Sequence, residues 1–457
     1  MKLLATIIQD AALVVIGFTL LYVFSLTIVG VRIMRRSGVR LGRQESLINE
    51  PPRASDADYH VYFLLPCLNE EEVIGGTIDA LLESQQRGAI VVIDDGSEDA
   101  TAAIARSKGD QVVVVSRTLP NARQGKGRAL NAGLELVRRD VESKGLPTRK
   151  VLVCVMDADG RMTPNALDAV APAFDEPSVG GVQLVVRIRN RDSLKLRFQD
   201  MEFWAMSGVG QIGRIATGTV SMGGNGQFTR LFALDEIGTN PWSDSLTEDL
   251  DLGISLSVLG WTTTSTSGAY VTQQGVDDLR RLIKQRTRWY QGHMLASKRF
   301  GELLRSPFLR NIGFFELGAY LAVPWGITLP WSIIQQYLLV QILTGQGLPN
   351  HVLESGPIAG RVGYAVVWYL ASFAPHLFWG WLYWRRAEDV NMGRALLMCH
   401  LMVPWSYVSY AAAWRAFYRI VTGQHGWTKT ARSAEDAPEP LGNTPPDGTA
   451  TANHIAR

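Results

Sequence analysis

The sequence predicts an α/β domain with a doubly wound, mostly parallel sheet, together with transmembrane helices. Short β-branched runs alternate with helical patterns in the middle of the chain, and long apolar stretches lie near its two ends. Asp, Glu, Lys and Arg are concentrated in the middle. With 457 residues, the chain is long enough for one large domain with a complete core and for a membrane part.

The sheet is predicted from four short runs that have the composition of strands buried on both faces. Helical patterns occupy the segments between them, and this alternation is typical of a parallel sheet. Ligands of such sheets bind beyond the carboxyl ends of the strands, so functional side chains are expected directly after each strand. The runs are Tyr59–Leu65, Ala89–Ile93, Val112–Val115 and Val151–Met156, and the helical patterns are Glu71–Gln85, Glu98–Lys108 and Gly127–Lys144.

An N-terminal membrane span is predicted at Ala11–Val31, an uncharged apolar run of about the 20 residues that cross a bilayer. Positive charge follows this run, whereas a cleaved signal peptide carries it in front. The segment is therefore expected to be retained, with the N-terminus outside and the basic cluster in the cytoplasm. The cluster comprises Arg32, Arg35, Arg36, Arg40 and Arg43.

Further apolar segments follow the predicted domain at Ile312–Leu343, Val362–Trp384 and Ala395–Ile420, and Pro324 and Pro330 interrupt the first. Basic residues between the last two segments indicate a cytoplasmic loop; they are Arg385, Arg386 and Arg394. The predicted parts are a membrane helix with its basic flank (1–50), a cytoplasmic domain with an interfacial helix (51–300), membrane or interfacial helices (301–422), and a C-terminal segment (423–457) that is disordered from about Ala437.

Composition argues against two classes of protein. The formal net charge of +2 is too small to indicate a nucleic-acid partner. The three cysteines, Cys67, Cys154 and Cys399, have no metal-ligand spacing and are expected to be small buried hydrophobic residues. A disulfide-stabilised scaffold is therefore not expected.

Asp157-Ala158-Asp159 follows the last predicted strand directly. Two carboxylates at the open end of a buried strand repel each other unless a cation lies between them. Mg²⁺ or Mn²⁺ prefers oxygen ligands and would neutralise the charge that develops on a leaving nucleoside diphosphate. The alternative is an ordinary turn, but the position after a fully apolar strand favours a metal site with Asp157 and Asp159 as ligands.

Other strand ends supply candidates for nucleotide binding. The first strand runs into Pro66-Cys67-Leu68-Asn69-Glu70, and Pro66 and Glu70 are candidates there. The second runs into Asp94-Asp95-Gly96-Ser97, where Asp95 is a candidate to accept hydrogen bonds from a base or ribose. The alternative is that Ser97 or Asp95 caps the helix that follows. Lys126, in a Gly-Lys-Gly turn before a predicted helix, binds phosphate or base, or belongs to an ordinary basic turn.

A second acidic pair, Glu248 and Asp249, follows Thr247. An inverting sugar transfer needs one base that takes the proton from the acceptor hydroxyl, and Asp249 is the candidate, with Glu248 as its neighbour. The alternative is a helix cap by Thr247. The preceding glycine-rich segment permits close approach of the backbone to a sugar, or is an ordinary loop, and its Asn225 is a candidate for acceptor contact.

The segment Gln285-Arg286-Thr287-Arg288-Trp289 lies in a helical pattern, so Gln285, Arg288 and Trp289 share one face. The Arg288 guanidinium is suited to diphosphate oxygens, and the Trp289 ring offers a flat wall for a sugar. The alternative is a basic amphipathic helix on the membrane surface, because further cations surround the motif. They are Arg280, Arg281, Lys284 and Arg286.

Taken in order, these motifs resemble those of the processive family-2 glycosyltransferases, such as cellulose, hyaluronan, chitin and poly-N-acetylglucosamine synthases. The family order is Asp, Asp-x-Asp, Thr-Glu-Asp and Gln-x-x-Arg-Trp, followed by membrane helices, and the match extends from about Tyr59 to Ile420. The resemblance implies a GT-A-like fold in which Asp95 and Asp157 hold the nucleotide and Asp159 holds the metal. It also implies that Asp249 is the base.

By the same resemblance, Gln285, Arg288 and Trp289 hold the diphosphate and the acceptor end, and Lys126 lies near the base of the nucleotide. The segment from Trp427 through Lys429 to Arg432 is similar to the one that closes over the nucleotide in relatives, although it departs from any one subfamily's version. Four spans would place this segment outside the cell. A cytoplasmic C-terminus is expected instead, either because the first C-terminal apolar segment crosses twice or because one segment is interfacial or re-entrant.

The expected function is that of a multi-pass plasma-membrane enzyme with a cytoplasmic catalytic domain. It transfers a hexose or N-acetylhexosamine from a UDP-sugar, with inversion, to a growing polysaccharide, with export and an accessory secretion partner. Three alternatives stay open: a single transfer to a lipid or lipid-linked acceptor, a GDP-sugar donor such as GDP-mannose, and a non-catalytic membrane partner of a synthase complex.

Overall fold

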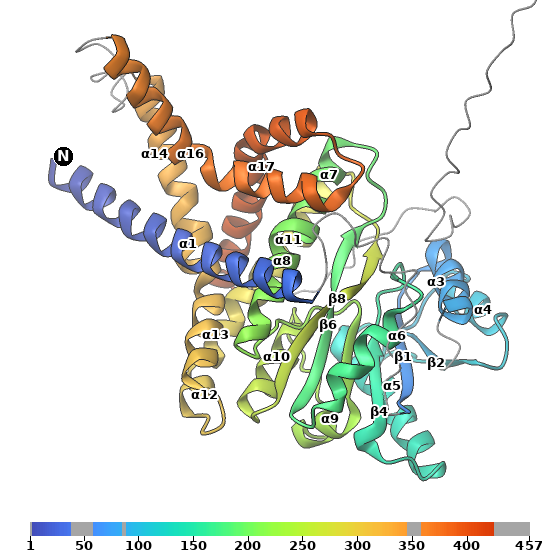
Figure 1. Ribbon diagram of the computed structural model, residues 1–457. Coiled ribbons are helices and arrows are strands. Elements are labelled where there is room, and N and C mark those ends of the chain that lie inside the picture. The colour runs from blue at the N-terminus through green and yellow to red at the C-terminus, as the bar shows by residue number, and fades with distance from the viewer. Residues whose placement is uncertain (1, 38–57, 85–87, 345–357, 425–457) are drawn as a thin grey trace, which may run out of the picture.

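The computed structural model describes residues 2–37, 58–84, 88–344 and 358–424. Its centre is an eight-stranded sheet with the order β3-β2-β1-β4-β7-β6-β8-β5 (Figure 1). The strands are β1 His60–Cys67, β2 Gly88–Asp94, β3 Val112–Ser116, β4 Val151–Val155, β5 Arg161–Met162, β6 Val179–Ile188, β7 Gln227–Arg230 and β8 Thr262–Gln273. All four strands predicted from β-branched runs are therefore present.

The sheet is mixed rather than uniformly parallel. The β3-β2-β1-β4 half is parallel throughout, as the strand–helix alternation predicts. In the other half β7 runs antiparallel to both neighbours, β6 and β8 are parallel, and β5 pairs antiparallel with β8. The expectation that every predicted strand is buried on both faces is wrong for β3, because it is an edge strand and its Val113 is 41% exposed.

Helices cover both faces of the parallel half, which makes it doubly wound. In β1, Val61, Phe63 and Leu65 pack into the core beneath α3, whereas Tyr62 and Leu64 pack beneath α5 on the opposite face. This alternation follows from the two-residue period of a strand. The flanking elements are α3 Glu71–Ser84, α4 Thr101–Arg106, α5 Lys126–Ser143, η1 Thr148–Lys150, α6 Ala166–Val170, η2 Ala171–Asp175, α9 Leu231–Ile237 and α10 Glu248–Val258.

A second layer of helices joins the sheet to the apolar ends of the chain. Its own hydrophobic core lies between β6, the π-helical segment η3 and the C-terminal helices. Its elements are α7 Leu194–Asp200, η3 Met201–Ser207, α8 Gly208–Gly213, η4 Arg214–Ala216, α11 Leu279–Ala296, η5 Ser297–Arg299 and α12 Phe300–Arg305.

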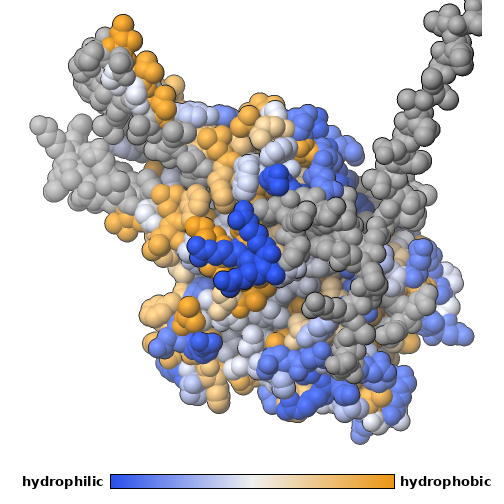
Figure 2. Space-filling view, viewed as in Figure 1, coloured by the Kyte–Doolittle hydropathy of each residue, from blue (hydrophilic) through white to orange (hydrophobic). Residues whose placement is uncertain are grey.

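Long apolar helices protrude from this layer on one side of the molecule, where hydrophobic side chains gather on the surface (Figures 1 and 2). Three stretches of the described residues are long and apolar enough to cross a membrane: Gly17–Arg36, Asn311–Tyr337 and Met392–Val421. The helices are α1 Lys2–Arg36, α13 Asn311–Val323, the π-helical η6 Pro324–Thr328, α14 Leu329–Leu343, α16 Ile358–Ala387 and α17 Met392–Val421.

Pro324 does not turn the chain back. It begins the single π-helical turn that connects α13 to α14, and the three form one continuous candidate span. A wider turn accommodates proline because it relieves the clash with the preceding carbonyl. The alternative in which this segment crosses the membrane twice is therefore wrong.

Candidate functional site

A cavity of about 610 Å³ lies where β1, β2 and β4 end at their carboxyl termini. It is lined there by Pro66, Glu70, Asp95 and Asp157, each of which follows or ends one of these strands. The other predicted residues that line it are Lys126, Asn225, Glu248, Asp249, Gln285, Arg288 and Trp289. The structure thus brings together eleven of the predicted site residues, which extend in sequence from Pro66 to Trp289.

Asp95 is buried and forms an ion pair with Arg117. Burial raises the pKa of its carboxyl group, and Arg117 among other partners opposes that rise. Neither Asp95 nor Ser97 caps the next helix, so that alternative is wrong: α4 begins at Thr101, and Asp99 accepts the hydrogen bond from the Thr101 N–H at 3.0 Å. Asp95 therefore remains directed at the cavity.

Lys126 occupies the centre of the acidic group. Its Nζ lies 2.6 Å from Asp157 Oδ1 and 3.7 Å from Glu248 Oε1, and it donates to the carbonyl of Gly224 at 3.2 Å. Burial by itself would lower the pKa of Lys126, but Asp157, Glu248 and Asp249 raise it, so the ammonium is charged. The positive charge of Lys126 therefore offsets the repulsion among these carboxylates.

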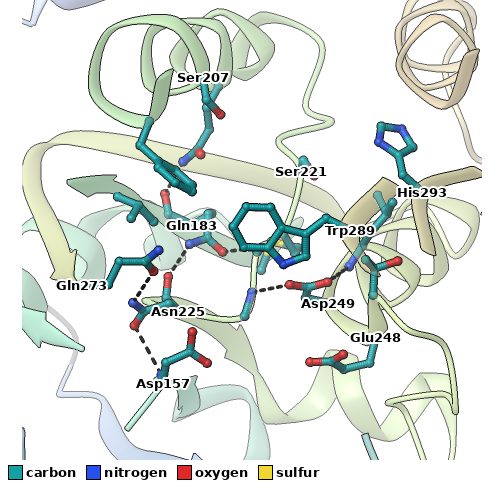
Figure 3. Close-up of a pocket in the computed structure, with 18 of the residues that line it drawn as sticks. Asp157, Gln183, Ser207, Ser221, Asn225, Glu248, Asp249, Gln273, Trp289 and His293 are labelled. Atoms are coloured by element: carbon teal, nitrogen blue, oxygen red, sulfur yellow. Dashed lines mark hydrogen bonds between the residues drawn. The ribbon is translucent and has the colours of Figure 1, made fainter. Parts of the chain in front are cut away.

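Asp249 is held at the first turn of α10 by two backbone N–H groups. Its Oδ2 accepts a hydrogen bond from Gly224 at 2.7 Å, and its Oδ1 accepts one from Leu250 at 2.7 Å (Figure 3). The N-terminal end of a helix also stabilises negative charge. Thr247 makes no side-chain capping bond to α10, so the capping alternative for this motif is wrong.

Glu248 is buried beside Asp249, and its pKa is raised. Burial, followed by the neighbouring charge of Asp249, raises the pKa of Glu248 to about 7, although Lys126 and Arg288 oppose this. Two adjacent carboxyl groups with different environments are suited to different roles. The partial exposure of Asp249 and its paired N–H donors favour it over the buried Glu248 as the group that accepts a proton from an acceptor.

Asn225 is fixed by a network of amide side chains that sequence reasoning missed. Gln183 donates to the Asn225 carbonyl at 2.7 Å, and Asn225 Nδ2 donates to Gln273 at 3.1 Å. Gln183 also accepts from the Gly223 N–H at 2.8 Å, so it positions the loop that binds Asp249. The available signal was a glutamine in the middle of the mostly apolar run Val179–Ile188.

The three predicted residues of α11 share one face, as their spacing predicts, and all line the cavity. Arg288 donates to the Leu246 carbonyl at 3.3 Å, next to the Glu248–Asp249 pair. The ring of Trp289 lines the cavity together with Asp249 and contacts Phe203 edge-on, with a centroid distance of 6.0 Å (Figure 3). An aromatic ring and a carboxylate in one cavity can bind a sugar ring beside a general base.

Arg286 has a different role from the one that the membrane-surface alternative gives it. It is buried, forms an ion pair with Glu202 of η3 and donates to Ser409 of α17 at 3.2 Å. Of the four neighbouring cations, only Arg280, Arg281 and Lys284 are exposed. The surface alternative is therefore wrong for Arg286, whose charge joins α11 to the C-terminal helices.

Asp159 is not among the residues that line the cavity. Its side chain is fully buried, and its Oδ2 accepts a hydrogen bond from the Gln274 backbone N–H at 2.9 Å. Asp157, by contrast, is 28% exposed at its side chain. Among the described residues, no three His, Cys, Asp or Glu side chains are arranged as a complete metal site.

The chemistry of Asp157 nevertheless fits Mg²⁺ or Mn²⁺. Such ions bind oxygen, and Mg²⁺ in particular is held by one or two carboxylates when substrate phosphates supply the other ligands. A partly exposed carboxylate at the cavity provides this donor, whereas the Asp159 side chain is fully buried and does not line the cavity. The predicted closing segment, Trp427, Lys429 and Arg432, lies outside the described residues.

Comparison with known proteins identifies the family of this site. Residues 58–292, which are 235 of the 457 residues, match the family described as "Glycosyltransferase like family 2". The chain belongs to glycosyltransferase family 2. The GT-A-like fold and the membership predicted from the motif order are thereby confirmed.

Relatives in this glycosyltransferase family differ in their named products. The chain is 33% identical to beta-monoglucosyldiacylglycerol synthase of Synechocystis sp. over 249 residues, which cover 52% of this chain and 49% of that protein. It is 28% identical to poly-beta-1,6-N-acetyl-D-glucosamine synthase of Staphylococcus aureus over 250 residues, which cover 54% and 58%. The chain thus spans about half of the length of these relatives.

Solved structures with a similar arrangement include the mannosyltransferase PcManGT from Pyrobaculum calidifontis in complex with GDP-Man and Mn²⁺. The similarity has a TM-score of 0.49 and 16% sequence identity, and it covers 88% of this chain and 100% of that one. Another is S. aureus TarS 1–349 in complex with UDP-GlcNAc, with a TM-score of 0.38 and 13% identity over 80% and 93% of the two chains.

Proposed function

We propose that this family-2 glycosyltransferase transfers a sugar from a nucleotide-sugar, with inversion, to an acceptor hydroxyl at the membrane. The observation that carries the proposal is the position of Asp249. It is held by two backbone N–H groups beneath Trp289, in the same cavity as Asp95, Lys126 and Asp157. The residues proposed for the donor and those proposed for the acceptor thus line the same cavity.

In the proposed reaction, the acceptor oxygen attacks the anomeric carbon from the side opposite the diphosphate. The bond from this carbon to the diphosphate oxygen breaks, and the nucleoside diphosphate leaves with the electron pair. The acceptor proton passes to Asp249, whose carboxylate two backbone N–H donors hold in position. Arg288 and Lys126 supply positive charge for the diphosphate.

Asp95 and the loop at Pro66 and Glu70 form the proposed nucleotide end of the cavity. A divalent ion bound at Asp157 would neutralise part of the diphosphate charge. UDP is the proposed nucleotide, and a GDP donor is the alternative that a donor panel decides. The proposed location is the plasma membrane, with several spans and the catalytic domain in the cytoplasm.

Two acceptors are consistent with the family. A growing glycan is favoured by the Trp289 ring beside the base, because aromatic faces bind sugar rings. A lipid is favoured by the membrane helices that line the same cavity. Incubation of the purified enzyme with labelled donors separates them: a glycan acceptor yields products that lengthen with time, and a lipid acceptor yields a single-sugar lipid.

The role of Asp249 is tested by Asp249→Asn. We expect transfer to fall by about 10²- to 10⁴-fold, because the amide cannot accept the proton. The dissociation constant for UDP-sugar is expected to change little, because the side chain keeps its shape. The matched control is Asp244→Asn. Asp244 is an exposed carboxylate in the segment that precedes α10, and it is paired with Arg128. Equal activity of Asp249→Asn and wild type would refute the assignment.

A further inference from the structure

The cavity continues beyond the transfer site to the candidate membrane helices. Its far part is walled by Val23 and Leu26 of α1, Val323 of α13, Ile327 of η6 and Trp379 of α16. Both α1 and the α13–α14 run contain stretches that are apolar and long enough to span a bilayer. One space therefore joins the acidic group at the sheet edge to apolar side chains of membrane helices.

The wall contributed by α1 is one face of that helix. Its lining residues, Tyr22, Val23, Leu26 and Thr27, occupy positions i, i+1, i+4 and i+5. Ile28 does not line the cavity and is 46% exposed. One face of this apolar helix therefore lines the cavity, whereas the opposite face is turned away from it.

The same wall is fixed relative to the catalytic domain by close backbone contact. A Cβ atom on Gly30 of α1 would lie 2.2 Å from the carbonyl oxygen of Val209 in α8. A Cβ atom on Gly213 of α8 would lie 2.1 Å from the carbonyl oxygen of Leu26. The two glycines thus allow α1 to pack closely against α8, whose Gly208, Gly210 and Gln211 also line the cavity.

A charge-balanced cluster contributes Tyr22, Arg214 and Tyr320 to the lining of the cavity, and we call it the polar boundary of the apolar part. Arg214 lies 2.7 Å from Glu316, donates to the Tyr22 hydroxyl at 2.9 Å and stacks on the Tyr320 ring at 3.7 Å. Thr219 also donates to Glu316 at 2.5 Å. Because Glu316 neutralises Arg214, this boundary offers hydroxyl and aromatic groups rather than net positive charge. It suits an uncharged headgroup better than a phosphate.

We infer that the apolar part of the cavity binds the hydrocarbon chains of an uncharged lipid alcohol, whose hydroxyl reaches Asp249. The inference rests on the proposed function and specifies its acceptor. The walls from Val23, Leu26, Val323 and Ile327 remove the chains from water, and the Tyr22–Arg214 boundary receives the headgroup. Affinity then rises with chain length, by up to about fourfold for each fully buried methylene.

The test uses the full-length enzyme in detergent and two acceptor probes, 1,2-dibutyrylglycerol and 1,2-dioctanoylglycerol. The measured quantity is the ratio of kcat/KM for the longer probe to that for the shorter one. Leu26→Trp and Val323→Trp fill the apolar part, and we expect each to lower this ratio by on the order of tenfold. Ile28→Trp, on the opposite side of the same helix, is expected to leave the ratio unchanged.

Hydrolysis of the donor without acceptor reports whether each variant is folded and binds nucleotide-sugar, and it is expected to persist. A ratio that Leu26→Trp and Val323→Trp leave unchanged would overturn the inference, as would a preference for a phosphorylated lipid alcohol. Elongation of a soluble oligosaccharide with no transfer to either glyceride would overturn the inference and leave the proposed function intact. Absence of donor turnover with every nucleotide-sugar and every acceptor would instead overturn the proposed function.

Discussion

At the scale of single residues, the site depends on one cation among several carboxylates. Lys126 contacts Asp157 and Glu248 directly, and Asp249 lies close enough to affect its charge. The lysine therefore holds the acidic group together in the free enzyme. In the proposed reaction, the same ammonium would interact with the diphosphate oxygens of the donor.

The protonation of Glu248 gives a pH-dependent prediction. Burial and then Asp249 raise the pKa of Glu248 from 4.5 to about 7, so the folded protein binds this proton more tightly than the unfolded chain. Its contribution to stability is complete below about pH 4.5 and is lost as the pH rises through about 7. We expect the Tm of Glu248→Gln, relative to wild type, to increase between pH 5 and pH 7.5.

This measurement is made by thermal unfolding in detergent, with a chelator and without nucleotide. Glu98→Gln, at an exposed carboxylate paired with Arg123, controls for the general effect of removing one negative charge. A Tm difference for Glu248→Gln that stays constant or decreases as the pH rises would contradict the assignment.

At the scale of helices, α11 carries out three tasks on three faces. Gln285, Arg288 and Trp289 face the cavity, and Arg286 forms its ion pair with Glu202. Gln291 donates to the carbonyl of Gln424 at 2.6 Å. One helix therefore links the transfer site to the membrane part and to the chain that follows α17.

The Arg286–Glu202 pair gives a prediction about stability. Glu202→Gln leaves the Arg286 charge buried without its carboxylate, and Trp405, which donates to Glu202 at 2.9 Å, keeps an amide oxygen as partner. We expect a loss of about 3–5 kcal/mol, because an unpaired buried charge is costly. The double variant Arg286→Met/Glu202→Leu is expected to lose much less in the same unfolding measurement. An equal or larger loss in the double variant would contradict the electrostatic explanation.

The contact between α1 and α8 gives a second prediction for helices. Gly30→Ala places a methyl group against the Val209 carbonyl, and we expect a loss of about 1–3 kcal/mol from overpacking. Gly17→Ala is the matched control on the same helix, because nothing lies within 4 Å of an added Cβ there. Thermal unfolding in detergent compares the two, and equal effects would show that α1 is not closely packed on α8.

At the scale of the whole molecule, the path of the helices places the end of the described chain, Gln424, beside the sheet domain. Gln424 lies against α11, which belongs to the catalytic domain, although it is separated from that domain in sequence by all the C-terminal helices. The helices that leave the sheet domain therefore also return to it (Figure 1). This path supports the proposal of a C-terminus on the same side as the catalytic domain.

A protease-cleavable reporter placed after Arg457 tests this topology. We expect external protease to leave the reporter intact in whole cells and to remove it after the cells are permeabilised. A matching reporter fused before Met1 is expected to be cleaved from outside. The protein is also expected to stay with membranes at alkaline pH and to require detergent for release. Cleavage of the C-terminal reporter in intact cells would refute the arrangement.

The sequence by itself determined the parallel half of the sheet, the family and the set of residues at the strand ends. These features are local: β-branched runs, helical periods and short motifs each occupy a few consecutive residues, and carboxyl ends of parallel strands meet at one edge whatever follows. Three of the four predicted membrane segments correspond to candidate spans among the described residues, because length and composition are set by the bilayer, whereas Val362–Trp384 does not.

Only the tertiary structure decided the mixed half of the sheet, the withdrawal of Asp159 from the cavity, the amide network around Asn225 and the wall formed by α1. Each depends on partners far apart in the chain, such as Asp159 with Gln274, or Gly30 with Val209. Periodicity shows which face of an element is apolar, but not which distant element covers it. That choice is made by packing, and it places the candidate site in one cavity with the candidate membrane helices.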